Sequence, residues 1–239
     1  MKRSLPRLLA ALAVISLTAA ACGNNNDSKG AAAATDDAVT TTTHDTHDAM
    51  NASAAGTASG TDTASSKLRS GLTALLQEHV YLAGITTGTA LAGGDYKVPA
   101  AVLDANSVAL AEAVGSVYGK PAGDQFLALW RKHIGFFVDY TVAASKNDAA
   151  GKAKAGRDLD QYRADFDAFL TGANPNLPKG AVAAELVPHV QTLEAAIDAQ
   201  AAKDPTQYAK LATAAAHMPM TAEILAGAIA KQFPEKFAS

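Results

Sequence analysis

The clearest hydrophobic pattern in the chain is a helical one, over residues 124–148. Its large apolar residues recur every three or four positions, which places them on one side of an α-helix: Phe126, Leu129, Trp130, Phe136, Phe137 and Tyr140. Gln125, Lys132 and Asp139 follow each other at intervals of seven and form a separate polar stripe. His133 therefore lies in the middle of the apolar face of the predicted helix.

Similar periodic segments fill the chain after residue 66, with glycine and proline gathered between them. We expect six helices, at about residues 66–91, 99–118, 124–148, 149–170, 180–202 and 205–233. The last of these contains Pro219, which removes one backbone hydrogen bond and should kink it. No strand-like alternation of any length occurs in the sequence, so the predicted fold class is all-α.

The spacing of three histidines indicates an internal repeat. His79, His133 and His189 are 54 and 56 residues apart, and each lies in the first helix of a predicted pair. Recurrence at a nearly fixed interval is the sequence signature of a repeated structural unit. The sequence thus predicts an antiparallel bundle of about six helices built from three helical-hairpin repeats.

A second set of polar residues is expected at the height of these histidines. Asn106, Tyr162 and His217 lie in the second helices, 27 to 29 residues after the histidine of the same hairpin. If each turn is near the middle of that interval, both residues lie roughly 20 Å from the loops at 1.5 Å per residue. The six side chains would then form one polar layer across the bundle.

Four imidazoles in an apolar interior predict a transition-metal site, because neutral imidazole is a common ligand of copper, zinc and iron. The predicted ligands are His79, His133, His189 and His217. Met220 follows His217 on nearly the same face, and its thioether favours copper over zinc or iron. Glu185, one turn before His189, is the only acid well placed to join them.

The same layer has a second interpretation, in which no metal is bound. Each histidine would then hydrogen-bond to Tyr162, Asn106 or another histidine and fix the register of the repeats. Under both interpretations burial disfavours the imidazolium form, so the histidines are expected to be neutral. The fold should therefore lose stability as the pH falls below about 6.5.

Other function classes are disfavoured by what the sequence lacks. It contains no haem-attachment motif, no Glu-x-x-His pair of the di-iron bundles and no His-Glu-x-x-His motif of metalloproteases. Its net charge of −3 gives no basic footprint for nucleic acid. We therefore expect a protein without catalytic activity, and the sequence names no protein partner.

The N-terminus predicts export and anchoring. Residues 1–21 have a basic start and an apolar run that ends in small residues, as in a signal peptide. Cys22, the only cysteine, follows three alanines and is similar to the lipidated cysteine of bacterial lipoproteins. This similarity implies a lipid anchor at Cys22, which would hold the protein at the outer face of the cell membrane.

Residues 22–66 are expected to be a disordered linker, which leaves residues 67–239 as the helical domain. The linker is rich in Asn, Asp, Thr, Ser, Ala and Gly and cannot bury enough apolar surface to fold. His44 and His47, each followed by an aspartate, could bind a divalent metal loosely, although polar low-complexity sequence is the simpler interpretation.

Three segments of the helical domain carry a resemblance to a known family. They are LQEHV at 76–80, LWRKH at 129–133 and QFPEKF at 232–237. The chain resembles an uncharacterised family of bacterial secreted helical proteins, some of which are labelled copper amine oxidase-like. The resemblance implies a helical fold and export. It implies no amine oxidase chemistry, because that enzyme's catalytic β-structure has no counterpart in this sequence.

Overall fold

The computed structural model describes residues 61–237, all of which belong to one compact unit. The predicted signal peptide, Cys22 and the histidines of the linker, His44 and His47, lie outside the described residues. The predictions made for them are therefore not tested by the structure.

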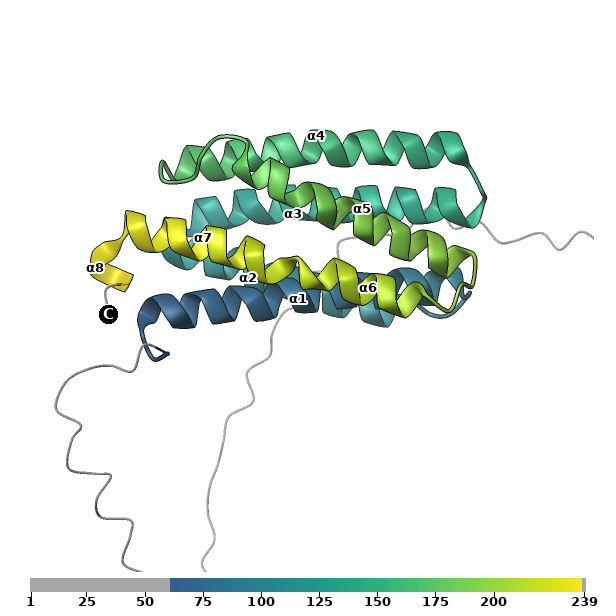
Figure 1. Cartoon of the computed structure of the whole chain (residues 1–239), viewed down its shortest axis with the longest axis horizontal. Coiled ribbons are helices and arrows are strands. Elements are labelled where there is room, and N and C mark those ends of the chain that lie inside the picture. The colour runs from purple at the N-terminus through teal and green to yellow at the C-terminus, as the bar shows by residue number, and fades with distance from the viewer. Residues whose placement is uncertain (1–60, 238–239) are drawn as a thin grey trace, which may run out of the picture. The chain divides into compact units, whose positions relative to one another are not determined.

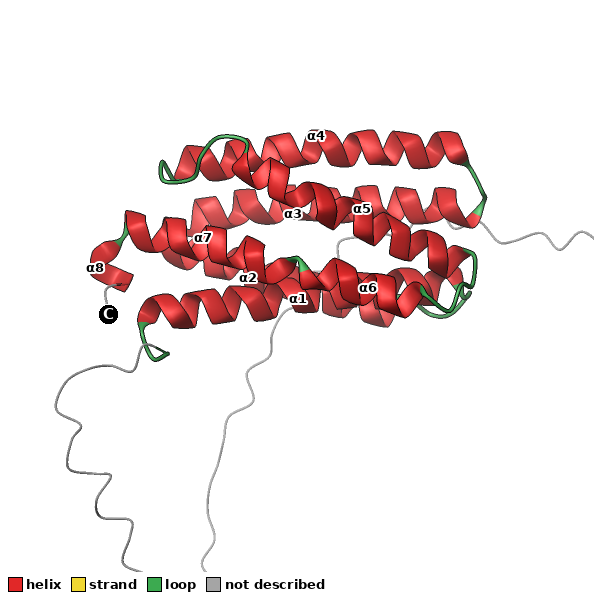
Figure 2. Ribbon diagram, in the orientation of Figure 1, coloured by secondary structure: helices red, strands yellow, loops and turns green. Residues whose placement is uncertain are grey.

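Eight helices and no strand occur in the described part of the chain (Figures 1 and 2). The helices are α1 (Ala64–Leu91), α2 (Lys97–Tyr118), α3 (Lys120–Ser145), α4 (Ala149–Ala173), α5 (Ala181–Ala201), α6 (Gln207–Ala216), α7 (Met218–Gln232) and α8 (Pro234–Phe237). The all-α prediction is confirmed, and the first five helices begin and end within about four residues of the expected positions.

The sixth predicted helix is divided into α6 and α7, which meet at His217. Pro219 is the second residue of α7. In one continuous helix its ring would collide with the carbonyl four residues earlier, and it has no N–H to donate. A new helix start tolerates proline, so the chain ends α6 and begins α7 where only a kink was expected.

The helices form three antiparallel hairpins, α1 with α2, α3 with α4, and α5 with α6 and α7 (Figure 1). The second helix of each hairpin also packs against the first helix of the next, because α2 contacts α3, α4 contacts α5, and α7 contacts α1. The first helices α1, α3 and α5 contact one another inside this ring. Such cyclic contacts are what a threefold hairpin repeat predicts.

The first two hairpins are joined by a very short connection. Gly119, the only residue between α2 and α3, has a φ of 90° that side chains disfavour. α2 and α3 pack closely beside this turn, since a Cβ on Gly123 of α3 would lie 2.7 Å from the carbonyl oxygen of Ala111 of α2. α3 therefore begins at Lys120, four residues earlier than its apolar periodicity indicated.

α2 alone, among the described helices, has the length and mean hydropathy that a membrane span would need. Such a helix is weak evidence for a span, and α2 packs between α1 and α3 with Asn106 and Ser107 buried. These contacts assign it to the bundle.

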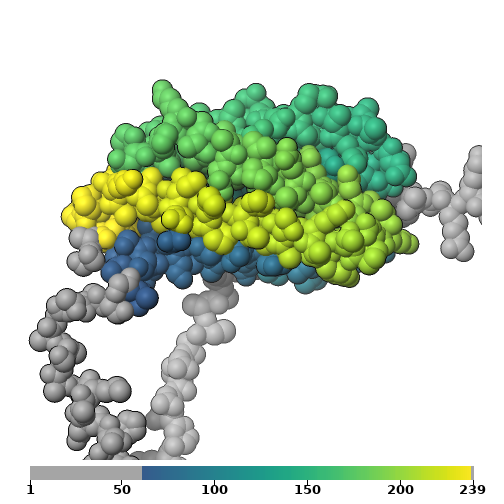
Figure 3. All heavy atoms as spheres, viewed as in Figure 1, coloured from purple at the N-terminus to yellow at the C-terminus, as the bar shows by residue number. Residues whose placement is uncertain are grey.

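In Figure 3 the side chains of α5 and α7 meet over the interior on the face shown.

A buried carboxylate holds the start of α5. Asp167, on α4, is 7% exposed and accepts hydrogen bonds from the backbone N–H groups of Gly180 at 2.8 Å, Val182 at 3.1 Å and Ala183 at 3.3 Å. The first N–H groups of a helix have no hydrogen-bond partner within that helix. The Asp167 carboxylate, which belongs to another helix, accepts from them in place of an N-cap side chain. Asp167 thereby fixes the height of α5 against α4.

We expect Asp167→Ala to lower the free energy of unfolding by about 3 kcal/mol, because it leaves buried N–H groups without an acceptor. Urea unfolding at pH 7 measures the change. Asp124→Ala is the matched control, because it breaks only an exposed ion pair with Lys120 and should cost no more than about 1 kcal/mol. Equal losses in the two variants would contradict the capping role.

Candidate functional site

Three histidines meet in the interior, one from the first helix of each hairpin. His79 of α1 is 2% exposed, His133 of α3 is 3% exposed and His189 of α5 is 6% exposed. The helices that carry them contact one another. The repeat spacing of the sequence therefore predicted correctly that these three side chains are buried at the centre of the bundle.

His79 and His133 face each other through their Nε2 atoms, which are 3.3 Å apart. Two neutral imidazoles in this arrangement share one N–H, and the ring that accepts it must carry its own proton on Nδ1. Neither Nδ1 has a hydrogen-bond partner among the described residues. The pair therefore leaves one buried N–H and one buried lone pair unused.

Aromatic rings surround the two histidines. The ring of Trp130 has its centre 4.8 Å from that of His79 and 4.6 Å from that of His133. Tyr162 stacks on the other side of His133, with centres 4.8 Å apart and planes inclined by 24°. His189 meets the edge of Phe137 at 6.4 Å, and its Nδ1 also has no partner. Apart from the N–H shared by His79 and His133, packing against aromatic rings holds the imidazoles in place.

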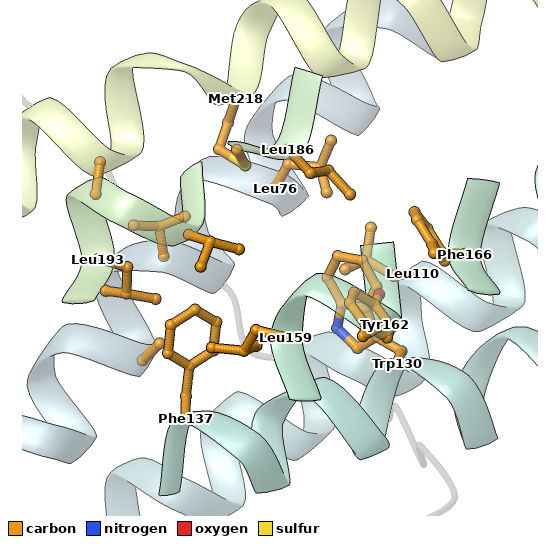
Figure 4. Packing of buried hydrophobic residues seen from close by; sticks show 14 of the residues in the cluster. Leu76, Leu110, Trp130, Phe137, Leu159, Tyr162, Phe166, Leu186, Leu193 and Met218 are labelled. Carbon is orange, nitrogen blue, oxygen red and sulfur yellow. The ribbon is translucent and has the colours of Figure 1, made fainter. Parts of the chain in front are cut away.

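An apolar cavity of about 80 Å³ begins at these rings and extends toward the end of the bundle where α2 meets α3. Figure 4 shows core side chains around this space, with Leu76, Leu186 and Met218 on one side and Trp130, Tyr162 and Phe166 on the other. All three hairpins contribute to its walls. The histidines form the polar end of an otherwise apolar space.

Unpaired polar atoms gather at this cavity. Nine buried side-chain nitrogen or oxygen atoms of the described residues lack a hydrogen-bond partner, and seven of them belong to residues that line it: His79, Trp130, His133, Tyr162, Arg163, His189 and Thr221. Native interiors leave few such groups unsatisfied, and each one calls for water, an ion or a ligand. Their concentration around one space marks it as the candidate site.

Burial keeps the three imidazoles neutral. It lowers the pKa of His79 to about 3 and that of His189 to about 4, and a neighbouring histidine acts in the same direction in each case. Burial, followed by the charges that His79 and His189 would carry, lowers the pKa of His133 well below its usual range, against a small opposing effect of the Trp130 carbonyl. At neutral pH each ring therefore offers a lone pair and one N–H.

The other predicted ligands are not at this site. His217 is half-buried at the junction of α6 and α7, and it does not line the cavity. Met220 is 59% exposed, whereas Met218 is 2% exposed and lies in the cavity wall. The buried stripe of α6 and α7 runs through Ala214, Met218 and Ala222 at intervals of four, which leaves His217 and Met220 on other sides of these helices. Glu185 is half-buried and also lies outside the cavity lining.

The two predicted layer partners have different roles. Asn106 is buried but turns toward α1, where its amide donates to the carbonyl of Leu75 at 3.0 Å and to Oε2 of Glu78 at 2.8 Å. Tyr162 contacts His133 with its ring face, and its hydroxyl has no partner. Only Tyr162 therefore belongs to the histidine site, and no hydrogen bond joins either residue to a histidine.

Trp130, Thr221 and Met218 are site residues that sequence reasoning did not assign. Trp130 precedes His133 by three positions, and this spacing alone was a usable signal that the two rings share a face. Met218 and Thr221 follow Ala214 by four and seven residues, so helical periodicity was the signal for them too.

No group of three or more His, Cys, Asp or Glu side chains close enough to hold a metal ion occurs within residues 61–237. A scan against protein-family models, a search of curated proteins and a search of solved structures each found no match to this chain. The family resemblance and the export that it implies therefore stay predictions, whereas the helical fold that it implies is confirmed.

The lowered pKa values predict how stability responds to pH. Above about pH 6.5 the buried histidines are neutral in both the folded and the unfolded chain, and they cost nothing. As the pH falls from 6.5 toward 4, the histidines become protonated in the unfolded chain but stay neutral in the folded protein, because their pKa values are lower there. The free energy of unfolding therefore drops by about 1.4 kcal/mol per pH unit for each histidine.

Urea unfolding of the metal-free protein between pH 7.5 and 5 should show this drop, and His189→Gln should make it about one third shallower. A wild-type free energy that stays flat from pH 6.5 to 5, or an equal slope in the variant, would show that these imidazoles are accessible to protons in the folded protein.

Proposed function

We propose that the histidine site binds one copper(I) ion and that the protein is a non-catalytic metal-binding protein. The observation that carries this proposal is the 3.3 Å separation of the Nε2 atoms of His79 and His133. Two imidazole nitrogens bound to one tetrahedral ion, each at 2.0–2.1 Å, lie about 3.3–3.4 Å apart. The same distance is slightly long for a hydrogen bond between neutral groups.

The charge of the site favours a monovalent ion. No carboxylate lines the cavity, and its walls are almost entirely apolar. A dication would bring two uncompensated charges into this interior, and the cost of burying an ion rises steeply with its charge. Copper(I) carries one charge and prefers soft, neutral ligands, whereas zinc and iron(II) bind more strongly where carboxylates or thiolates offset their charge. Zinc and iron are thus the less favoured metals.

Met218 takes the place that the sequence gave to Met220. Its side chain is buried in the cavity wall, grouped with Leu76 and Leu186 in Figure 4. These two leucines precede His79 and His189 by three residues each, about one helical turn. In the proposed site Met218 approaches the ion from about one turn away, its thioether is a soft ligand for copper(I), and His189 supplies a further imidazole.

A second function is favoured by the same contact. The shared N–H of His79 and His133 joins α1 to α3, so the histidines could act only in fixing the register of the hairpins. In that case the protein would be a structural or partner-binding module of the cell surface. The two functions differ in one measurable property, the affinity for copper.

We expect one equivalent of copper(I) to bind to protein in which His44 and His47 are replaced by alanine, so that the linker cannot contribute. Titration against a chromogenic copper(I) chelator without oxygen measures the affinity. His79→Gln should weaken binding by about 100-fold or more, because it removes one of two facing ligands, and Met218→Leu by about 10-fold. Zinc under the same conditions should bind more weakly than copper(I).

Met220→Leu is the matched control, since the same change on the exposed face of α7 should leave the affinity unchanged. Less than a tenth of an equivalent of copper(I) retained after dialysis would remove the metal function and leave the structural one. Equal affinities of the His79→Gln and control variants would place the ion elsewhere.

We further propose that the protein is held by a lipid at Cys22 on the outer face of the cell membrane, with the residues between Cys22 and α1 as its tether. The predicted linker boundary at residue 66 is too late, because α1 begins at Ala64. The sequence supports this through the signal-like residues 1–21 and the single cysteine that follows them. The anchor places the bundle where it meets extracytoplasmic copper. It does not depend on which of the two functions is correct.

Cys22→Ala should prevent lipid attachment and shift the protein from the membrane fraction to the soluble fraction of an expressing bacterium. Labelling with a radioactive fatty acid, followed by fractionation, measures both effects. Ser28→Ala, a change in the same segment, is the control that should retain label and membrane association. Membrane association of unlabelled wild-type protein would contradict the lipid anchor.

A further inference from the structure

The first hairpin has an apolar outer face, formed by α1 and α2 on the side that points away from the core. Eight large apolar side chains are exposed among the described residues, and four of them belong to this face. They are Tyr81 and Ile85 of α1 and Val98 and Val102 of α2, each between 43% and 69% exposed. Single exposed apolar residues are common on protein surfaces, whereas a group of them marks an interaction site.

A hydrogen bond between the two helices shows that these four residues lie side by side. The amide of Asn106 of α2 donates to Oε2 of Glu78 of α1 at 2.8 Å, so these two residues are at the same height in the antiparallel hairpin. Val102 is four residues before Asn106, and Tyr81 is three residues after Glu78. The two side chains are therefore at one height, and the next turn places the other valine beside the isoleucine.

α2 carries a second apolar stripe besides the one that faces the core. Only 28% of its most apolar 18-residue window is buried, although a helix that is apolar on all sides is normally covered on all sides. The outer stripe consists of Val98, Val102, Ala105 and Ala109, at intervals of four, three and four residues. This is the spacing with which one helix packs along another. The stripe lies roughly a quarter turn around α2 from Asn106, so it does not face α1.

The outer stripe is complementary to itself in the reverse direction. Its two valines come first and its two alanines last. A second α2 packed antiparallel therefore places Val98 against the partner's Ala109 and Val102 against the partner's Ala105. The small alanines let the two helices approach closely, because the distance between helix axes depends on the side chains at the contact. A twofold axis, the commonest symmetry of protein oligomers, produces this arrangement.

Charged residues beside the stripe fit the same arrangement. Lys97 and Glu112 are exposed near its two ends, and neither side chain has an ion-pair partner among residues 61–237. The twofold axis brings Lys97 to within about 3 Å, measured along the helix, of the level of the partner's Glu112. Two ion pairs can then form across the interface. An anionic lipid surface fits less well, because Glu78, Asp95 and Glu112 border the face.

The size of the face suits a dimer. Its four large apolar side chains expose roughly 400 Å², which is in the range of patches that are often functional. Ala101, Ala105, Lys97 and Glu112 are exposed beside them and bring the surface to roughly 700 Å² for each copy, close to the roughly 800 Å² that each partner contributes to a standard interface. The face is thus large enough to hold two copies together without a further protein.

We propose that the protein forms a twofold-symmetric dimer, in which α1 and α2 of one copy pack antiparallel against α1 and α2 of a second copy. The two α2 helices meet along their outer stripes, and Tyr81 and Ile85 of both copies cover the side of the interface that α1 forms. The dimer is independent of copper and of the lipid anchor, because the interface uses no residue of the cavity lining and no residue before α1.

Sedimentation equilibrium of the full chain with Cys22→Ala, which removes the lipid site, measures the association. We expect a reversible monomer–dimer equilibrium between about 1 and 100 μM. Val102→Asp should weaken it at least 100-fold, because it buries two facing carboxylates without a counter-charge. Val138→Asp is the matched control, since it makes the same change at an exposed valine of α3 and should dimerise as the parent does.

Two further sets of variants test the antiparallel arrangement. Lys97→Glu should weaken dimerisation about 10-fold, and adding Glu112→Lys should restore it, because the exchange recreates both ion pairs. Ala105→Cys, near the twofold axis, should form a disulfide-linked dimer when diamide oxidises the Cys22→Ala protein. Ser116→Cys is the matched control on the same stripe, where the two copies of the residue lie roughly 40 Å apart and should not be linked.

A monomer mass at every concentration up to about 100 μM would overturn the proposal. So would equal dimerisation of the Val102→Asp and Val138→Asp proteins, or cross-linking of Ser116→Cys as fast as that of Ala105→Cys. Binding of a monomeric parent protein to phosphatidylglycerol vesicles, abolished by Val102→Asp, would assign the face to the membrane and overturn the dimer. Because the parent protein alone decides the first outcome, poor folding of a variant leaves the test intact.

Discussion

The structure depends on three uncharged imidazoles that are buried where the three hairpins meet. His79, His133 and His189 come from the three helices that contact each other inside the ring, and only one N–H is shared among them. A positive charge on one ring would lie beside two other basic rings and an apolar wall. The interior can therefore form only with neutral histidines, which lowers their pKa values and leaves several nitrogen atoms with unused hydrogen-bonding capacity.

Neutrality also decides what the interior can accept. A cation in this interior would have no negative side chain beside it, since neither Glu185 nor any other carboxylate lines the cavity. This cost separates copper(I) from the divalent metals more sharply than ligand type does.

Much of the fold could be predicted because the signals were periodic. The apolar spacing located the helices, and the 54- and 56-residue intervals located the buried histidines on the first helix of each hairpin. The positions of His217 and Met220 were predicted wrongly because the layer was counted to His217, whereas the buried stripe of α6 and α7 passes through Ala214, Met218 and Ala222. Asp167 gave no signal either, since it caps a helix that begins fourteen residues later. The cavity could not be foreseen, because it depends on where side chains fail to fill space.

Binding of a metal ion would change the tautomers of His79 and His133. Binding a metal through the Nε2 atoms of His79 and His133 requires both lone pairs there, so both rings must then carry their proton on Nδ1. Without metal, only one of them does, because the other donates its Nε2 proton across the 3.3 Å contact. Metal binding would therefore raise the number of unpaired Nδ1–H groups from one to two, in addition to the unpaired indole N–H of Trp130, and only the Trp130 carbonyl lies near enough to His133 to affect its pKa. Zinc and copper sites in proteins normally provide such an acceptor for the second ring nitrogen.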